Sequence, residues 1–355
     1  VVISGLTFAN GNASLRGGAI ESLGENLIVR DSAFVGNVSA EVGGGIGFCG
    51  EGVAFLELHG TTFTGNSAEF VGGALYACEP IATLISGCTF TGNSTISDSD
   101  GGLGGAVFVD DATGPVTIRD SRFVGNSAYY LGGAVFVDVS DPDAAVLVQG
   151  CTFSGNTTQG GGGALAADSV ESGGRIAIVG STFDLNAAEG CGCGSSGGGA
   201  VAVQGFDDVR IENSRFTGNS TTGVGGAISA ALYYTESGAS FSVANTTFSG
   251  NTADGPGGAI QLFGTGNSTV TVQNSTFANN VSGFAGGAIS EFLNELVLVE
   301  NSTFVDNTAL DAGGAIDLFS NAIVRNSTIT GNSALIGGGI YFTGEELTLV
   351  STILA

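Results

Sequence analysis

The sequence predicts an all-β fold, a single right-handed parallel β-helix (solenoid) of about 12 coils with three short strands in each coil. A Phe returns every 25 to 33 residues from Phe8 to Phe304, and Ile329 takes the twelfth place. In every copy but the first, an Asn follows three residues later, and then come Gly-Gly, Ala or Gly, and an aliphatic residue. Apolar residues alternate with a period of two, and no window has sustained helical spacing. The period is too short for a propeller blade and lacks the leucine-rich consensus.

Each period holds three predicted strands. The first opens at the Gly-Gly-Ala-aliphatic unit, the second has the form Val-x-Ile, as in Val116 to Ile118, and the third has the form Ser-x-Phe, as in Ser121 to Phe123. One residue between the second and third strands is always Gly, Asn or Asp, which tolerate positive φ. We therefore expect a left-handed bend at Asp31, Gly60, Gly87, Asp120, Gly150, Gly180, Asn213, Asn245, Asn274, Asn301 and Asn326.

Stacking of such coils about 4.8 Å apart places like residues on one another. The Phe side chains are then expected to form one buried column, and the Asn side chains can form amide hydrogen bonds between coils. The predicted Phe ladder comprises Phe34, Phe63, Phe90, Phe123, Phe153, Phe183, Phe216, Phe248, Phe277 and Phe304.

The repeat fills the chain from end to end, which favours one elongated domain over residues 1–355. The chain begins and ends partway through a repeat, so we interpret it as a piece of a longer protein. The turn between the Asn and the Gly-Gly pair is longer than usual at residues 94–103 and 187–197. These two insertions are expected to project from the same corner, three coils apart.

Composition disfavours several classes of partner. The net charge is -25, with eight Lys and Arg in total, so the clustered cations needed to bind nucleic acid or anionic lipid are missing. No apolar run approaches the roughly 20 residues of a membrane span, so direct insertion of this segment is not expected. The expected partners are cell-surface or extracellular-matrix components, glycans, cations such as calcium, or a second copy stacked end to end.

One candidate site lies three residues beyond the aliphatic residue of five consecutive coils. These positions are occupied by Cys49, Cys78, Asp110, Asp138 and Asp168, which are expected to form a column along one edge. Stacked carboxylates repel one another, which raises some pKa values or attracts a cation. Three interpretations stay open for the Asp residues: a calcium site, a carboxylate pair for glycoside hydrolysis, or a solvated acidic edge.

The cysteines divide into pairs with different expected roles. Cys49 and Cys78 occupy neighbouring coils of one column, close enough for a disulfide, which we predict. Cys88 and Cys151 belong to the inward Ser/Thr column but lie two coils apart, so they are predicted to be buried thiols.

The remaining candidates are weaker. Cys191 and Cys193, in an insertion, could pair with each other, bind a metal or link to another chain. Asn267 is the predicted glycosylation site, because it lies in a variable turn outside the repeat's Asn columns. His59 is expected to be a surface residue, since the pattern places no acid behind it for a Ser-His-Asp arrangement.

Two motifs carry a family resemblance. Phe63-Thr64-Gly65-Asn66 followed by Gly72-Gly73-Ala74-Leu75 resembles the repeats of the chlamydial polymorphic outer membrane proteins (Pmp), and the likeness covers essentially the whole chain. The resemblance implies a right-handed β-helix, exposure at the cell surface or secretion, and an adhesive role. It implies no catalytic residues.

We therefore expect an extracellular, non-catalytic structural or adhesive rod. The alternatives are a polysaccharide-acting enzyme or carbohydrate-binding module of the pectate-lyase type, and a subunit of an extracellular filament. A pectate-lyase-type site should place a basic residue beside its carboxylates. The outward residues Arg119, Arg122, Arg210 and Arg215 are instead expected beside the Ser-x-Phe strands, away from the Asp column.

Overall fold

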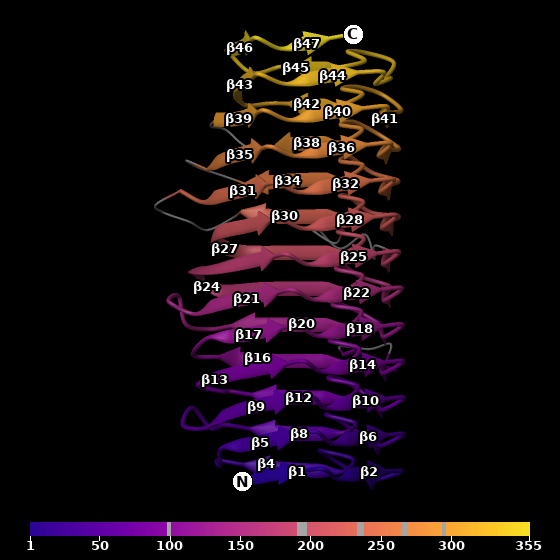
Figure 1. Cartoon of the computed structure of the whole chain (residues 1–355), viewed down its shortest axis with the longest axis vertical. Coiled ribbons are helices and arrows are strands. Elements are labelled where there is room, and N and C mark those ends of the chain that lie inside the picture. Colours follow the sequence, from indigo (N-terminus) through magenta and orange to yellow (C-terminus); the bar gives the residue numbers. More distant parts are fainter. Residues whose placement is uncertain (98–100, 190–196, 233–237, 265–267, 293–295) are drawn as a thin grey trace.

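The protein is an elongated right-handed β-helix in which every strand pairs in parallel with its equivalents in the coils above and below (Figure 1). The computed structural model describes residues 1–97, 101–189, 197–232, 238–264, 268–292 and 296–355. The two termini lie at opposite ends of the rod. In the described ranges there is no helix with the length and apolar character needed to cross a bilayer.

The largest sheet has 23 strands and contains the first and second predicted strand types. The ladder of Gly-Gly-Ala strands comprises β4 (Ile20–Leu23), β8 (Ile46–Cys49), β12 (Leu75–Cys78), β16 (Val107–Ala112), β20 (Val135–Val139), β24 (Leu165–Val179), β27 (Val201–Glu212), β30 (Ile228–Leu232), β34 (Ile260–Gly264), β38 (Ile289–Phe292), β42 (Ile316–Leu318) and β45 (Ile340–Phe342). The ladder of Val-x-Ile strands comprises β1 (Val2–Ser4), β5 (Leu27–Arg30), β9 (Phe55–His59), β13 (Ala82–Ser86), β17 (Val116–Arg119), β21 (Ala145–Gln149), β31 (Ser240–Ala244), β35 (Thr269–Gln273), β39 (Leu296–Glu300), β43 (Asn321–Arg325) and β46 (Leu347–Val350). The long strands β24 and β27 run through both ladders and join them.

The second sheet has 13 strands and holds the Ser-x-Phe type. Its strands are β2 (Thr7–Ala9), β6 (Ala33–Val35), β10 (Thr62–Thr64), β14 (Thr89–Thr91), β18 (Arg122–Val124), β22 (Thr152–Ser154), β25 (Thr182–Asp184), β28 (Arg215–Thr217), β32 (Thr247–Ser249), β36 (Thr276–Ala278), β40 (Thr303–Val305), β44 (Thr328–Thr330) and β47 (Ile353–Leu354). The thirteenth strand, β47, has no counterpart among the twelve copies aligned in the sequence. Its Leu354 pairs with Ile329 and takes the place where most copies have Phe, so the sequence pattern did not reveal it.

A third sheet has 11 strands of only two residues each, and the sequence pattern did not predict it. From β7 onward, these strands begin directly after the repeated Asn. They are β3 (Asn12–Ala13), β7 (Val38–Ser39), β11 (Ser67–Ala68), β15 (Ser94–Thr95), β19 (Ser127–Ala128), β23 (Thr157–Thr158), β26 (Ala187–Ala188), β29 (Ser220–Thr221), β33 (Thr252–Ala253), β37 (Val281–Ser282) and β41 (Thr308–Ala309).

The corners of the coil depend on positive φ angles. All eleven predicted bend residues have positive φ, between 45° and 63°, which confirms the single-residue bend. The first Gly of each Gly-Gly pair is also left-handed, with φ of 61° at Gly72. A Cβ at Gly72 would collide with the carbonyl oxygen of Leu75, and one at Gly73 with that of Gly105 in the next coil. The pair therefore turns the chain where no side chain fits.

The Phe column forms the centre of the core. The ten predicted Phe side chains are all 0% exposed. From Phe8 to Phe304 consecutive ring centroids lie 4.7 to 4.9 Å apart, with nearly parallel planes. Stacking at this distance follows from the in-register parallel pairing, for example of Phe63 with Phe90, because it equals the spacing between strands.

A buried Asn ladder runs beside the Phe column. The Asn156 side chain is 0% exposed, and its Nδ2 donates to the carbonyl of Phe123 at 3.1 Å and to Oδ1 of Asn186 at 2.9 Å. Its Oδ1 accepts from the backbone N–H and from Nδ2 of Asn126, both at 3.0 Å. The same bonds recur in neighbouring coils, so each Asn satisfies buried backbone groups and ties two coils together.

Candidate functional site

The Asp column lies on the outer face of the largest sheet. Strand β16 carries Asp110, β20 carries Asp138, and β24 carries Asp168. Asp138 is paired directly with Asp168, whereas the register shifts between β16 and β20 at Asp110 and Asp111. The three predicted carboxylates are therefore in adjacent coils, with a bulge at the first of them, and all are half-buried.

Burial dominates the electrostatics of this column. Burial, followed by repulsion from Asp168, Asp110 and Asp111, raises the pKa of Asp138 to about 7. Burial also raises the pKa values of Asp110 and Asp168 above the ordinary carboxyl range. Asp138 can thus bind or release a proton near neutral pH, and its Oδ1 has no hydrogen-bond partner within the described part of the chain.

An aromatic stack on the same outer face explains this burial. Phe108 and Phe136 are only 5% and 6% exposed although they point away from the main core, and their ring centroids lie 5.0 Å apart. Tyr76 extends the stack at 5.8 Å from Phe108, and its hydroxyl donates to Oδ2 of Asp110 at 2.6 Å. Burial and this hydrogen bond raise the pKa of Tyr76. The sequence interpretation missed the stack, although the aromatic residues follow the aliphatic position of three consecutive coils.

The carboxylates do not converge as ligands do. No group of three or more His, Cys, Asp or Glu that could hold a metal ion occurs among the residues that the structure describes. Stacking keeps one carboxylate per coil, whereas calcium takes six to eight oxygen ligands around one point. Calcium binding by Asp110, Asp138 and Asp168 stays a prediction.

The predicted disulfide between Cys49 and Cys78 stays a prediction. The two residues are paired in register as expected, and their Sγ atoms lie 2.6 Å apart, with both cysteines free in the structure. Burial, and to a smaller extent the interaction with Cys49, raises the pKa of the Cys78 thiol to about 12. The repeat gives the positions of the two cysteines, and the redox conditions decide whether they are bonded.

Cys88 and Cys151 are buried free thiols in the inward Ser/Thr column, as the spacing indicated. Burial raises the pKa of each to about 11, so neither is a reactive thiolate at neutral pH. Asn267, Cys191 and Cys193 lie outside the described residues.

His59 differs in part from expectation. It is paired with Arg30 and Ser86 in the neighbouring coils, and an acid does contact it, because Nε2 lies 3.0 Å from Oε2 of Glu57. Both side chains are partly exposed, and residues two apart on a strand share a face. The contact is thus a surface ion pair when His59 is protonated, which contributes little stability.

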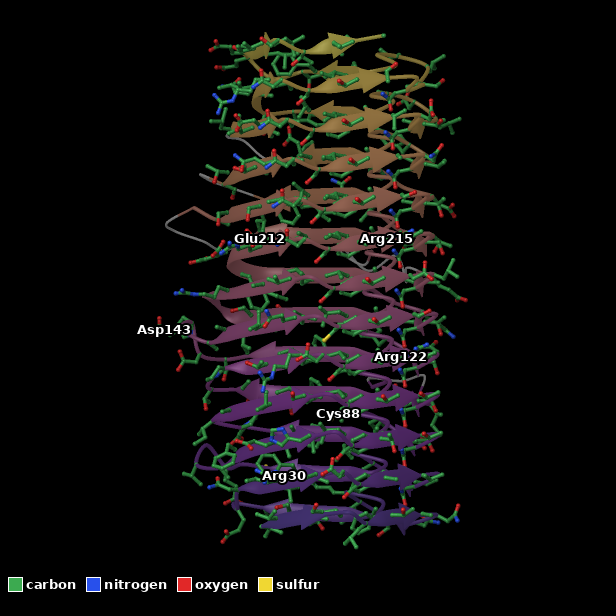
Figure 2. All side chains as sticks on the ribbon, viewed as in Figure 1. Arg30, Cys88, Arg122, Asp143, Glu212 and Arg215 are labelled. Carbon is green, nitrogen blue, oxygen red and sulfur yellow. The ribbon has the colours of Figure 1, made fainter. Side chains whose placement is uncertain are left out.

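Two of the outward Arg residues lie on a different sheet from the Asp column. Arg122 and Arg215 project from the 13-stranded sheet (Figure 2). In the described ranges the Arg ion pairs join Arg210 to Glu212 at 2.6 Å and Arg325 to Glu300 at 2.9 Å. Neither involves an Asp of the column.

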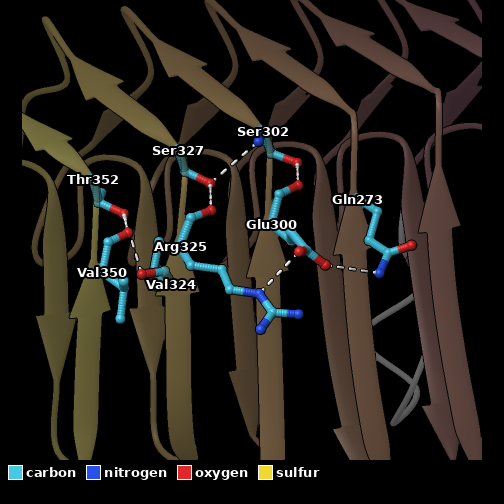
Figure 3. A network of polar contacts seen from close by, with 8 residues as sticks. All are labelled: Gln273, Glu300, Ser302, Val324, Arg325, Ser327, Val350 and Thr352. Carbon is cyan, nitrogen blue, oxygen red and sulfur yellow. Dashed lines mark hydrogen bonds and ion pairs between the residues drawn. The ribbon is translucent and has the colours of Figure 1, made fainter.

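Polar contacts also connect coils on the outer face (Figure 3). Glu300 accepts from Nε of Arg325 in the next coil and from Nε2 of Gln273, at 3.1 Å, in the coil before. Beneath them the Oγ of Ser327 accepts from the backbone N–H of Ser302 at 3.2 Å. These bonds run along the rod and stabilise stacking; the residues do not surround a cavity.

Glu291 was not singled out in the sequence, although it is fully buried. It takes an inward position between Leu262 and Leu318 in β38. Its carboxylate accepts from the backbone N–H groups of Phe319 and Ser320 at 2.6 and 2.7 Å, and from Oγ of Ser320 at 2.9 Å. These two residues form the whole turn between β42 and β43, so Glu291 positions a turn.

Comparisons with known families agree with this geometry. The Chlamydia polymorphic membrane protein repeat matches residues 60–78 and 150–168, each running from the bend through the Phe and Asn to the Gly-Gly-Ala strand. Neither a curated protein nor a solved structure matches the chain. The model of the right-handed β-helix region matches residues 169–352, just over half of the chain. The chain therefore belongs to the right-handed β-helix region family.

Proposed function

We propose that the chain is a non-catalytic, extracellular β-helical rod with a structural or adhesive role. The observation that carries the proposal is the unbroken stack from Phe8 to Phe304, with the Asn ladder beside it. A stack of this kind stabilises each coil through its two neighbours. Turns and outer side chains can then vary without loss of the fold, which is what a recognition surface requires.

The family match supports a location at the cell surface. The matched repeat is that of a polymorphic membrane protein, and adhesion is a function of proteins exposed outside the cell. The net charge of -25 favours cationic or neutral partners and disfavours anionic ones. Cell-surface or matrix components, including glycans, fit these conditions.

A polysaccharide-acting enzyme is the second candidate, and one observation favours it. A carboxyl group whose pKa is about 7, as at Asp138, is suited to general acid–base catalysis. Catalysis also requires a nucleophile or a second acid–base group at a defined distance from the reacting bond. Asp168, which is paired with Asp138 in the next coil, is the nearest candidate for that second group.

Retention of cells or matrix material on a surface coated with the rod tests the proposed role. We expect the folded rod to retain more material than the heat-unfolded rod and than an unrelated protein of equal net charge. Equal retention on all three surfaces would contradict an adhesive role.

A further inference from the structure

A groove runs along one corner of the rod, over the sheet of two-residue strands. Its volume is about 290 Å³. The lining residues come from four consecutive coils, from Thr95 through Tyr129 and Gln159 to Glu189. With strands about 4.8 Å apart, the groove is about 14 Å long.

The groove lies between the two places where the repeat is interrupted. Thr95 belongs to the insertion at 94–103, and Glu189 belongs to the one at 187–197. The floor is rigid, because β15, β19, β23 and β26 directly follow members of the Asn ladder. The first insertion also positions Tyr129. A Cβ at Gly102 would collide with the Cβ of Tyr129. The carbonyl of Gly102 accepts from the N–H of Tyr130 at 2.8 Å.

One buried polar group beneath the groove lacks a partner. Thr95 is only 5% exposed, and its Oγ1 has no hydrogen-bond partner within the described part of the chain. That oxygen has almost no accessible surface, so it lies beneath the floor of the groove and a ligand in the groove cannot contact it. The equivalent Thr158 and Thr221 accept from the backbone N–H two residues later. After Thr95, the insertion directs the N–H of Ser97 to the carbonyl of Glu69 instead.

The other lining groups suit a ligand rich in hydroxyl groups. The half-buried ring of Tyr129 offers an apolar surface with a polar tip. Exposed Gln159 supplies both donors and acceptors, and exposed Glu189 supplies acceptors only. Glu189 has no ion pair among the described residues and would repel a uronate.

We propose that this groove binds a neutral oligosaccharide chain laid along the rod axis. The proposal rests on the adhesive role above and assigns it a place and a ligand class. The sugar's apolar face lies on Tyr129, and its hydroxyl groups pair with Gln159 and Glu189. The groove crosses four coils of equal register, which suits a polymer with a regular repeat.

Calorimetric titration of the purified rod with tetrasaccharides tests the proposal. The probes are the β-1,4-linked tetramers of glucose, N-acetylglucosamine, xylose and mannose, with tetragalacturonate as the acidic comparison. We expect at least one neutral tetramer to bind and tetragalacturonate not to bind. Tyr129→Ala and Gln159→Ala should each weaken binding by about tenfold, the loss of one or two good contacts.

Two variants separate binding from folding. Thr95→Val keeps the shape of the floor and removes a hydroxyl that the ligand does not contact, so binding should be unchanged and the melting temperature equal or higher. Tyr130→Ala is the matched control, because Tyr130 is 41% exposed but does not line the groove. It should bind as the wild type does.

Several results would overturn the proposal: no neutral tetramer binds, only the uronate binds, or Tyr129→Ala and Tyr130→Ala have equal effects. Retention of cells that survives enzymatic removal of their glycans and is lost in Tyr129→Ala would indicate a protein ligand instead. If the wild type retains cells and Tyr129→Ala does so equally, the groove assignment fails and the adhesive role stands. If the wild type retains nothing, the adhesive role itself fails.

Discussion

Replacement of Asp138 by Asn is predicted to abolish the pH dependence that this residue imposes on stability. Burial and the neighbouring carboxylates Asp168, Asp110 and Asp111 raise its pKa from 3.8 to about 7. A carboxyl whose pKa is higher in the folded state stabilises the fold when protonated. That contribution is complete below the unfolded pKa and is lost as the pH rises through about 7.

The size of the effect follows from the shift. A change from 3.8 to about 7 corresponds to roughly 4 kcal/mol if nothing screens the charge. Asp138 is half-buried, and solvent screening reduces the expected contribution to about 1–2 kcal/mol. Asn resembles the protonated acid, so Asp138→Asn should be more stable than the wild type by this amount at pH 8 and nearly equal to it at pH 4.

Urea unfolding between pH 4 and pH 8.5 measures this difference. Asp143→Asn, in an exposed turn, is the control, because it removes the same charge away from the column (Figure 2). The rod's general response to its net charge is common to both variants and cancels in the comparison. Parallel curves for the wild type and Asp138→Asn, or a less stable variant at pH 8, would contradict a raised pKa at Asp138.

Three further predictions concern the ladders and the Asp column. Phe153→Ala should lower the free energy of unfolding by about 3–5 kcal/mol, as large core cavities do, and an unchanged melting temperature would contradict the buried stack. Asn156→Ala should cost about 2–4 kcal/mol, because it leaves a buried backbone N–H of the preceding coil unpaired; hydrogen exchange should show loss of protection at that N–H, and full protection would argue against the ladder. Calcium should raise the melting temperature of the wild type but not that of the Asp110, Asp138 and Asp168 triple Asn variant, and equal melting with calcium and with chelator would leave a plain acidic edge.

Much of the fold was predictable because its signals recur in almost every coil. The bend column contains only Gly, Asn and Asp, and each of these residues has positive φ. The Phe and Asn residues recur just as regularly, and a pattern repeated in so many coils does not arise by chance. The third sheet escaped prediction because strands of two residues have no alternation to detect, and β47 escaped because Leu354 replaces the aromatic residue.

The candidate sites were less predictable, because they depend on side chains that break the repeat. The position of Asp138 followed from counting along the coil, but its raised pKa depends on the outer stack of Phe108 and Phe136. The bonding of Cys49 could not be read from register alone. Tyr129, in the groove, comes from a variable turn, where no period specifies which residues meet.

The function proposed for the chain is adhesion without catalytic turnover. The most direct test incubates the folded protein with polyuronates and neutral glycans in the presence of calcium and measures new reducing ends or unsaturated products, beside retention of cells on the same preparation. We expect retention and no products. Turnover that is abolished by Asp138→Asn and kept by Asp143→Asn would contradict this expectation and would identify the chain as an enzyme.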